Sequence, residues 1–188
     1  TAWHSLIKTF DIAEVYFNRD YEPYAAGRDS AVTSLLKNKG IPVRDYKDQV
    51  IFEGGEVLRP EGLPYTVFTP YKKRWLAKVT AKLPFSPATP GIRSGNFMTS
   101  SFPFPSIGQI GFKRSPVTVR PYDLSVIGEY DKFRNVPSAD RTSYLSPHLR
   151  FGTVSIRKIT EIALKMNLVF ADELIWREFF MQILFHFP

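Results

Sequence analysis

Apolar residues in the first eighty positions alternate between helix and strand periods. An i, i+3, i+4, i+7 repeat near the N-terminus predicts an amphipathic helix and is formed by Trp3, Leu6, Ile7 and Phe10. The pattern then predicts, in order, a strand over 14–18, a helix over 19–38, short strands over 41–43 and 50–52, and a helix over 69–79. A strand–helix–strand order predicts a right-handed crossover and a parallel sheet. So few strands make only part of a doubly wound α/β domain.

The pattern changes after residue 80. Residues 83–121 contain seven of the fifteen prolines and show no stable period, so we predict an interdomain linker over 81–122. From residue 123 the spacing is helical again and predicts helices over 125–133, after Ser146, after Ser155, and over 169–187. The predicted fold class is therefore α/β followed by all-α, with a partial α/β domain over 1–80 and a helical region over 123–188.

Composition describes a soluble globular protein of 188 residues, with 44% hydrophobic and 23% charged residues. The chain has no cysteine, which excludes disulfides, thiolate metal sites and cysteine nucleophiles and fits a reducing, cytoplasmic location. The three histidines are too scattered to predict a metal cluster. No apolar run reaches the ~18 residues of a membrane span, and we expect no signal peptide.

Net charge is +7, which favours a polyanionic partner, and nucleic acid is the first to consider. The alternative is a charge that serves solubility alone.

One polar segment, R-T-S-Y-L-S-P-H-L-R-F-G over 141–152, carries the first candidate chemistry. Ser146 is a good N-cap, and Pro147 suits the first position of a helix that Gly152 then ends. The first-turn N–H groups would point back at the hydroxyls of Thr142 and Ser143. Such an arrangement suits an anion, in particular a phosphate. The alternative is an ordinary capped helix that follows polar residues.

The last predicted helix carries the second candidate site. An i, i+3, i+4, i+7 spacing places four residues on one face, namely Glu173, Trp176, Arg177 and Phe180, and turns Leu174, Ile175 and Glu178 away. A carboxylate, an indole and a guanidinium together can stack a base and hydrogen-bond its edge. The alternative is a Glu173–Arg177 helix pair worth about 0.2–0.5 kcal/mol with Trp176 in the core. We expect this face and the segment over 141–152 to close over opposite sides of one cavity.

The chain resembles the photolyase/cryptochrome family of flavoproteins. T-S-Y-L-S-P-H-L-R-F-G (142–152) is similar to the family signature T-S-x-L-S-P-x-L-x-x-G. Tyr130 lies twelve residues upstream of it, E-L-I-W-R-E-F-F (173–180) follows it, and N-R-D-Y-E-P-Y (18–24) is similar to the family's α/β domain. The closest resemblance is to class I cyclobutane pyrimidine dimer photolyases, and we expect this sequence to be an internal fragment of one.

The resemblance implies two sets of site residues. Residues expected to contact FAD are Tyr130, Thr142, Ser143, Tyr144, Leu145, Ser146 and Phe170. Residues expected to contact DNA are Arg134, Glu173, Trp176, Arg177 and Phe180. Two positions depart from the family, because Tyr144 replaces a common arginine and Phe170 stands where several relatives have tryptophan. Phe170 is therefore expected to pack and to have no redox role. No catalytic residue or metal ligand is expected within the chain.

The implied function is light-driven repair of DNA that contains pyrimidine dimers. In the family, an excited reduced FAD passes an electron to a flipped-out dimer, the cyclobutane ring opens, and the electron returns. Glutamate rather than glutamine at position 173 favours cyclobutane dimers as the substrate. The resemblance also implies an antenna chromophore of folate or deazaflavin type and a monomer, while the fragment alone is expected to retain little FAD and no activity. The alternatives are a cryptochrome-type photoreceptor and a non-enzymatic basic DNA-binding remnant.

Overall fold

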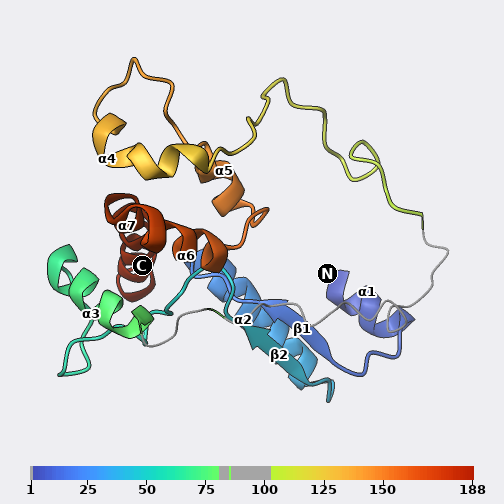
Figure 1. The fold of residues 1–188 in the computed structure, drawn as a ribbon. Helices are drawn as coiled ribbons and strands as arrows, with labels where there is room; N and C mark the ends of the chain where they lie inside the picture. The colour runs from blue at the N-terminus through green and yellow to red at the C-terminus, as the bar shows by residue number, and fades with distance from the viewer. Residues whose placement is uncertain (1, 81–84, 86–102) are drawn as a thin grey trace.

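The computed structural model describes residues 2–80, residue 85 and residues 103–188 (Figure 1). Most of the predicted linker, 81–84 and 86–102, lies outside the described residues. No helix among the described residues is both long and apolar enough to span a lipid bilayer.

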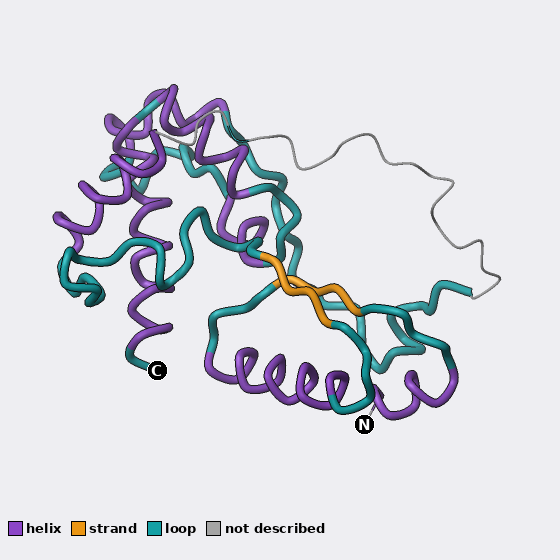
Figure 2. The backbone as a smooth tube through the Cα atoms, turned by 90° about the horizontal axis from the view of Figure 1, so that it is seen from below, coloured by secondary structure: helices purple, strands orange, loops and turns teal. Residues whose placement is uncertain are grey.

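A small parallel sheet forms the first part of the fold, as predicted. Strand β1 (Val15–Asn18) pairs with β2 (Val43–Tyr46) in parallel, with Val15 opposite Val43. Helix α1 (Ala2–Thr9) precedes β1, and α2 (Pro23–Lys37) connects the strands and lies along the sheet (Figure 2). The α2 helix starts later than the predicted residue 19, because the fixed φ of Pro23 suits the first helical turn. The predicted strand over 41–43 lies further along the chain, since β2 begins at Val43.

The strand predicted over 50–52 does not form, and the sheet in the described residues has two strands. A third strand would need the N–H groups of Ile51 and Phe52 to bond carbonyls of a neighbouring strand. They donate instead to the Glu178 carboxylate, at 2.6 and 3.0 Å. A side chain far along the sequence thus replaces the sheet partner that the apolar run had predicted.

The other helices lie close to their predicted ranges. They are α3 (Phe68–Thr80), a 3₁₀ turn η2 (Ser125–Glu129), α4 (Tyr130–Phe133), α5 (Leu145–Arg150), α6 (Ile156–Met166) and α7 (Leu168–His186). The single helix predicted over 125–133 is divided in two at Glu129, whose φ of −113° departs from helical values. Ser155 caps α6 as predicted, accepting from the N–H of Lys158. Asn167 caps α7, which the sequence reading did not identify.

Two apolar clusters stabilise the fold. The smaller one lies between α2 and the sheet and contains Val15, Leu36 and Ile41. The larger one joins residues 51–57 and α3 to α6 and α7, so its members come from both sides of residues 81–122. On α3 it buries Tyr71, Trp75 and Val79. Helix α3, which the sequence placed in the α/β region, therefore shares its core with the helical region and contacts α7 (Figure 1).

The cap of α7 gives a test of helix stability. The Asn167 side chain accepts from the N–H groups of Val169 and Phe170 at 3.0 and 3.2 Å. Asn167→Ala removes that acceptor and also the amide donor to Gly128 and Asp131, so we expect the free energy of unfolding, measured by urea denaturation, to fall by at least the ~0.5–2 kcal/mol of a lost cap. Asn38→Ala, an exposed position at the end of α2, is the control and should change it little. Equal stability of both variants would contradict the capping role.

Candidate functional site

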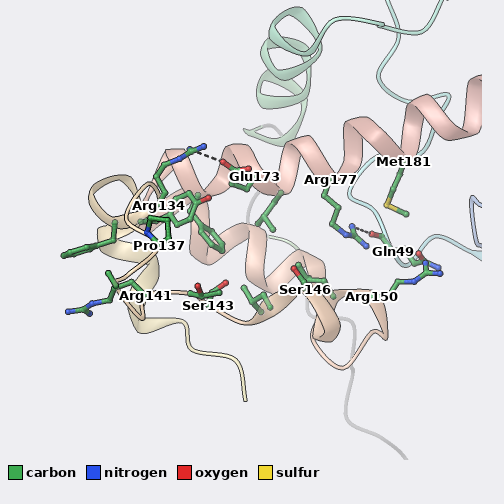
Figure 3. Close-up of a pocket in the computed structure, with 18 of the residues that line it drawn as sticks. Gln49, Arg134, Pro137, Arg141, Ser143, Ser146, Arg150, Glu173, Arg177 and Met181 are labelled. Carbon is green, nitrogen blue, oxygen red and sulfur yellow. Dashed lines mark hydrogen bonds and ion pairs between the residues drawn. The ribbon is translucent and has the colours of Figure 1, made fainter. Parts of the chain in front are cut away.

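A cavity of about 680 Å³ lies between α7, α4 and the segment that leads into α5 (Figure 3). Its volume is within the roughly 300–1,000 Å³ range of small-molecule sites. Figure 3 shows Glu173, Arg177 and Met181 along one side of α7, with Ser143 and Ser146 opposite. The predicted site residues that line it are Tyr130, Arg134, Thr142, Ser143, Leu145, Ser146, Phe170, Glu173 and Arg177. Tyr144, Trp176 and Phe180 are not among its lining residues.

One wall of the cavity combines an ion pair with aromatic rings. Arg134 Nη1 lies 3.0 Å from Glu173 Oε1, and the same guanidinium lies 5.3 Å from the ring centre of Tyr130. Tyr130 meets Phe170 edge to face, with ring centres 5.0 Å apart. Burial and the neighbouring Glu173 carboxylate raise the pKa of Tyr130, so its hydroxyl stays protonated and able to donate. Because both ion-pair partners are about one-third exposed (36% each), a ligand can separate them at low cost.

Helix α5 begins two residues earlier than predicted. Its first residue is Leu145, so Ser146 lies inside its first turn and does not cap it. The N-cap position belongs to Tyr144, which has a left-handed φ of 52° and makes no side-chain cap bond. At the far end Gly152 has a φ of +66°, which supports the predicted stop. The predicted cap is therefore wrong in register, although Thr142, Ser143 and Ser146 all line the cavity.

Contacts outside the cavity hold Tyr144. Its hydroxyl donates to Asp140 and accepts from Arg120, whose guanidinium also lies 4.9 Å from the tyrosine ring centre. A non-glycine residue in the left-handed region costs about 1–3 kcal/mol and persists only when its surroundings enforce it. The contacts that its side chain makes here are those with Arg120 and Asp140. They keep the side chain of Tyr144 away from the cavity, and its expected contact with FAD stays a prediction.

The rest of the lining is rich in arginine. The cavity is lined by four guanidinium groups, from Arg134, Arg141, Arg150 and Arg177, and by two carboxylates, from Glu22 and Glu173. Arg150 pairs with Glu22 at 2.7 Å, so a residue preceding α2 reaches the same site. The sequence reading missed Glu22 and Gln49, which no local signal connects to a segment more than a hundred positions away. Arg141 and Arg150 lie within the polar segment itself and could have been found there.

Trp176 and Phe180 lie in an aromatic stack instead of the cavity lining. The indole stacks on Phe68 with ring centres 3.6 Å apart and an interplanar angle of 7°, and Phe180 lies on it at 5.5 Å. Phe68 is the first residue of α3, so Trp176 packs against that helix. The single face predicted for four residues of α7 is thus divided, with Glu173 and Arg177 at the cavity and Trp176 and Phe180 at the stack. That all five predicted residues contact DNA remains a prediction.

Behind the cavity, Glu178 is buried with 3% of its surface exposed. Besides the N–H groups of Ile51 and Phe52, it accepts from Trp75 Nε1 at 2.6 Å. Burial raises the pKa of this carboxyl to about 7, because desolvation outweighs the three donors and the nearby Arg177 charge. Sequence reasoning placed Glu178 away from the candidate face but did not identify these contacts.

The chain is similar in sequence to known proteins along most of its length. A sequence model described as DNA photolyase matches residues 2–90. The deoxyribodipyrimidine photo-lyase of Synechococcus sp. is 31% identical, over 93% of this chain and 42% of its own length. The chain belongs to the DNA photolyase family.

Solved structures of photolyases share this fold. The crystal structure of a bacterial class III photolyase from Agrobacterium tumefaciens superposes with a TM-score of 0.76 at 25% identity, covering all of this chain and 44% of that one. An archaeal photolyase from Sulfolobus tokodaii, solved with two FAD molecules, gives a TM-score of 0.60 at 21% identity, over all of this chain and 42% of that one. The chain spans about 42% of the length of the curated relative from Synechococcus.

The raised pKa of Glu178 predicts a pH dependence of stability. Its pKa is about 7 in the fold against an ordinary value of 4.5, so between these values the folded state binds more protons than the unfolded one. The contribution of Glu178 to the free energy of unfolding is therefore fully present below pH 4.5 and declines as pH rises through 7, by about 3 kcal/mol in all. Glu178→Gln cannot titrate and should lack this decline.

Urea denaturation at several pH values tests the expectation. The free energy of unfolding of the unmodified protein, minus that of Glu178→Gln, should fall from pH 5 to pH 8. Glu61→Gln makes the same exchange at an exposed position and is the matched control. A constant difference for Glu178→Gln would show that its carboxyl keeps an ordinary pKa.

Proposed function

We propose that this chain forms part of a photolyase that repairs cyclobutane pyrimidine dimers in DNA by light-driven electron transfer from reduced FAD. The observation that carries the proposal is the cavity, where residues expected at the flavin and residues expected at the lesion line one space. Family membership and the photo-lyase names of the relatives support the same reaction. On this proposal, residues 1–80 belong to the α/β domain, 81–122 to the linker and 123–188 to the start of the helical FAD-binding domain.

The residues of the cavity fit FAD in their chemistry. Three hydroxyls, from Thr142, Ser143 and Ser146, lie with Arg141 and Arg150 in one lining, and such donors suit phosphate groups. Tyr130 and Phe170 offer aromatic surface beside them. When bound, FAD would supply the electron that opens the dimer. An antenna chromophore would add light absorption in the intact protein.

The chain's own residues would bind and orient the substrate. Glu173 can accept hydrogen bonds from the edge of a flipped base, and Arg134, once released from Glu173, can pair with a backbone phosphate. Arg177 adds positive charge to the cavity lining. Burial lowers the pKa of its guanidinium, which nevertheless stays charged at neutral pH. The net charge of +7 supports binding to the duplex around the lesion.

Flavin binding is tested at one hydroxyl. Ser146→Ala removes a donor from the lining, and a hydrogen bond to a charged group is worth about 1.5–3 kcal/mol. We therefore expect the dissociation constant of FAD from the full-length protein to rise about tenfold or more, measured by flavin fluorescence. Ser34→Ala, on the exposed side of α2, is the control. Equal flavin affinity in the two variants would show that the Ser146 hydroxyl does not bind FAD.

Repair itself is tested with a dimer-containing oligonucleotide. The full-length protein should restore the intact pyrimidines only under blue or near-ultraviolet light, as followed by loss of the dimer. Glu173→Ala removes a charged hydrogen-bond acceptor and should weaken dark binding of the lesion about tenfold or more. Binding without light-dependent turnover would favour a photoreceptor of the cryptochrome type. Salt-sensitive binding with no preference for damaged DNA would favour a non-enzymatic DNA-binding protein.

A further inference from the structure

Two adjacent residues of α7 hold the same short stretch of main chain. Arg177 Nη1 donates to the carbonyl of Gln49 at 2.8 Å. Glu178 Oε2 accepts from the N–H of Ile51 at 2.6 Å, and its Oε1 accepts from the N–H of Phe52 at 3.0 Å. Residues 49–52 are therefore bound to α7 through both their carbonyl and N–H groups.

The two contacts face different surroundings. Arg177 and Gln49 line the cavity, and Figure 3 shows the bond between them. Glu178 is buried behind them, next to Trp75, and does not line the cavity. Gln49 precedes Ile51 by only two residues and belongs to no strand, so the contacts of Glu178 lie close to the Gln49 carbonyl along the chain.

We propose that Glu178 is a positioning residue for the cavity. By fixing the N–H groups of Ile51 and Phe52, it places the Gln49 carbonyl, and that carbonyl in turn orients the Arg177 guanidinium at the cavity floor. A charge held in one orientation binds a ligand more tightly than one that must be ordered on binding. The geometric part stands without a ligand, whereas the effect on DNA rests on the proposed function.

A neighbouring residue provides the control for simple stabilisation. Gln182 lies one turn further along the same side of α7 and donates to the carbonyls of Gly54 and Val57 at 2.8 and 3.1 Å. It binds main chain slightly further along and is comparably buried, but it is not among the residues that line the cavity. Gln182→Leu should destabilise the fold without moving Arg177.

The first experiment observes the Arg177 guanidinium by NMR. Glu178→Gln keeps one oxygen for Phe52 and Trp75 but turns an amide NH₂ toward the N–H of Ile51, the contact nearest Gln49. We expect the Arg177 guanidinium resonances, assigned by their loss in Arg177→Lys, to shift toward solvent-exposed values. Their hydrogen exchange should accelerate about tenfold, as expected when one hydrogen bond is lost. In Gln182→Leu they should stay unchanged.

Unchanged resonances in Glu178→Gln, or an equal shift in Gln182→Leu, would overturn the proposal. If Glu178→Gln does not fold, Glu178→Asp decides in its place. It keeps the charge and both oxygens but withdraws them by one methylene, so it should shift the same resonances. Native Arg177 resonances in folded Glu178→Asp would then overturn the proposal.

The second experiment measures binding of a dimer-containing oligonucleotide in the dark by the full-length protein. Glu178→Gln should raise the dissociation constant about tenfold, the scale of a mispositioned binding group. In an Arg177→Met background the same substitution should have no further effect, because its action passes through Arg177. An effect that persists in that background would overturn the positioning role. Absence of any preference for dimers in the unmodified protein would overturn the proposed function instead, and the NMR result would still decide the positioning role.

Discussion

The buried carboxylate of Glu178 is the contact on which the arrangement of this fold depends. It joins three donors from two separate parts of the chain, namely the N–H groups of Ile51 and Phe52 and the indole of Trp75. Gln182, one turn further along α7, and His186, two turns further, both bond the carbonyl of Gly54. Because Glu178, Gln182 and His186 recur every four residues, one side of α7 satisfies the main chain over 51–54 that no sheet partner satisfies.

This polar side of α7 explains how the cavity forms from distant segments. The connection that follows β2 is also held by Arg157 of α6, which donates to the carbonyl of Lys47 at 2.9 Å. With residues 47–54 fixed, Gln49 reaches the cavity floor, and Glu22, just before α2, pairs with Arg150 of α5. The cavity is therefore built by packing between the sheet and the helices, and its arginines meet because both parts are held together.

Local chemistry was predictable from the sequence, and distant pairing was not. Ser155 caps α6 and Gly152 adopts the left-handed conformation that ends α5, since each acts on its own few neighbours. The apolar run over 50–52 was wrongly predicted as a strand, because periodicity cannot identify a partner 127 positions away, such as Glu178. The N-cap of α5 was predicted two residues too late for the same reason. Tyr144, in its left-handed conformation, contacts Arg120, which lies 24 positions upstream.

Helix α7 shows most clearly why one helical face could not be assigned from sequence. Its surroundings differ on every side. Trp176 stacks on the Phe68 ring of α3, and Glu173 and Arg177 line the cavity. Glu178 accepts from the N–H of Ile51. A helix with apolar and polar partners all round carries no single stripe that points to one core. Trp176 and Glu173 are three residues apart and both lie in the family-like segment over 173–180. Trp176 nevertheless stacks on Phe68, while Glu173 lines the cavity. For the indole to pack against a flipped base on its Phe68 side, that ring must first move aside, so Phe68 competes directly with the base for that face of the indole.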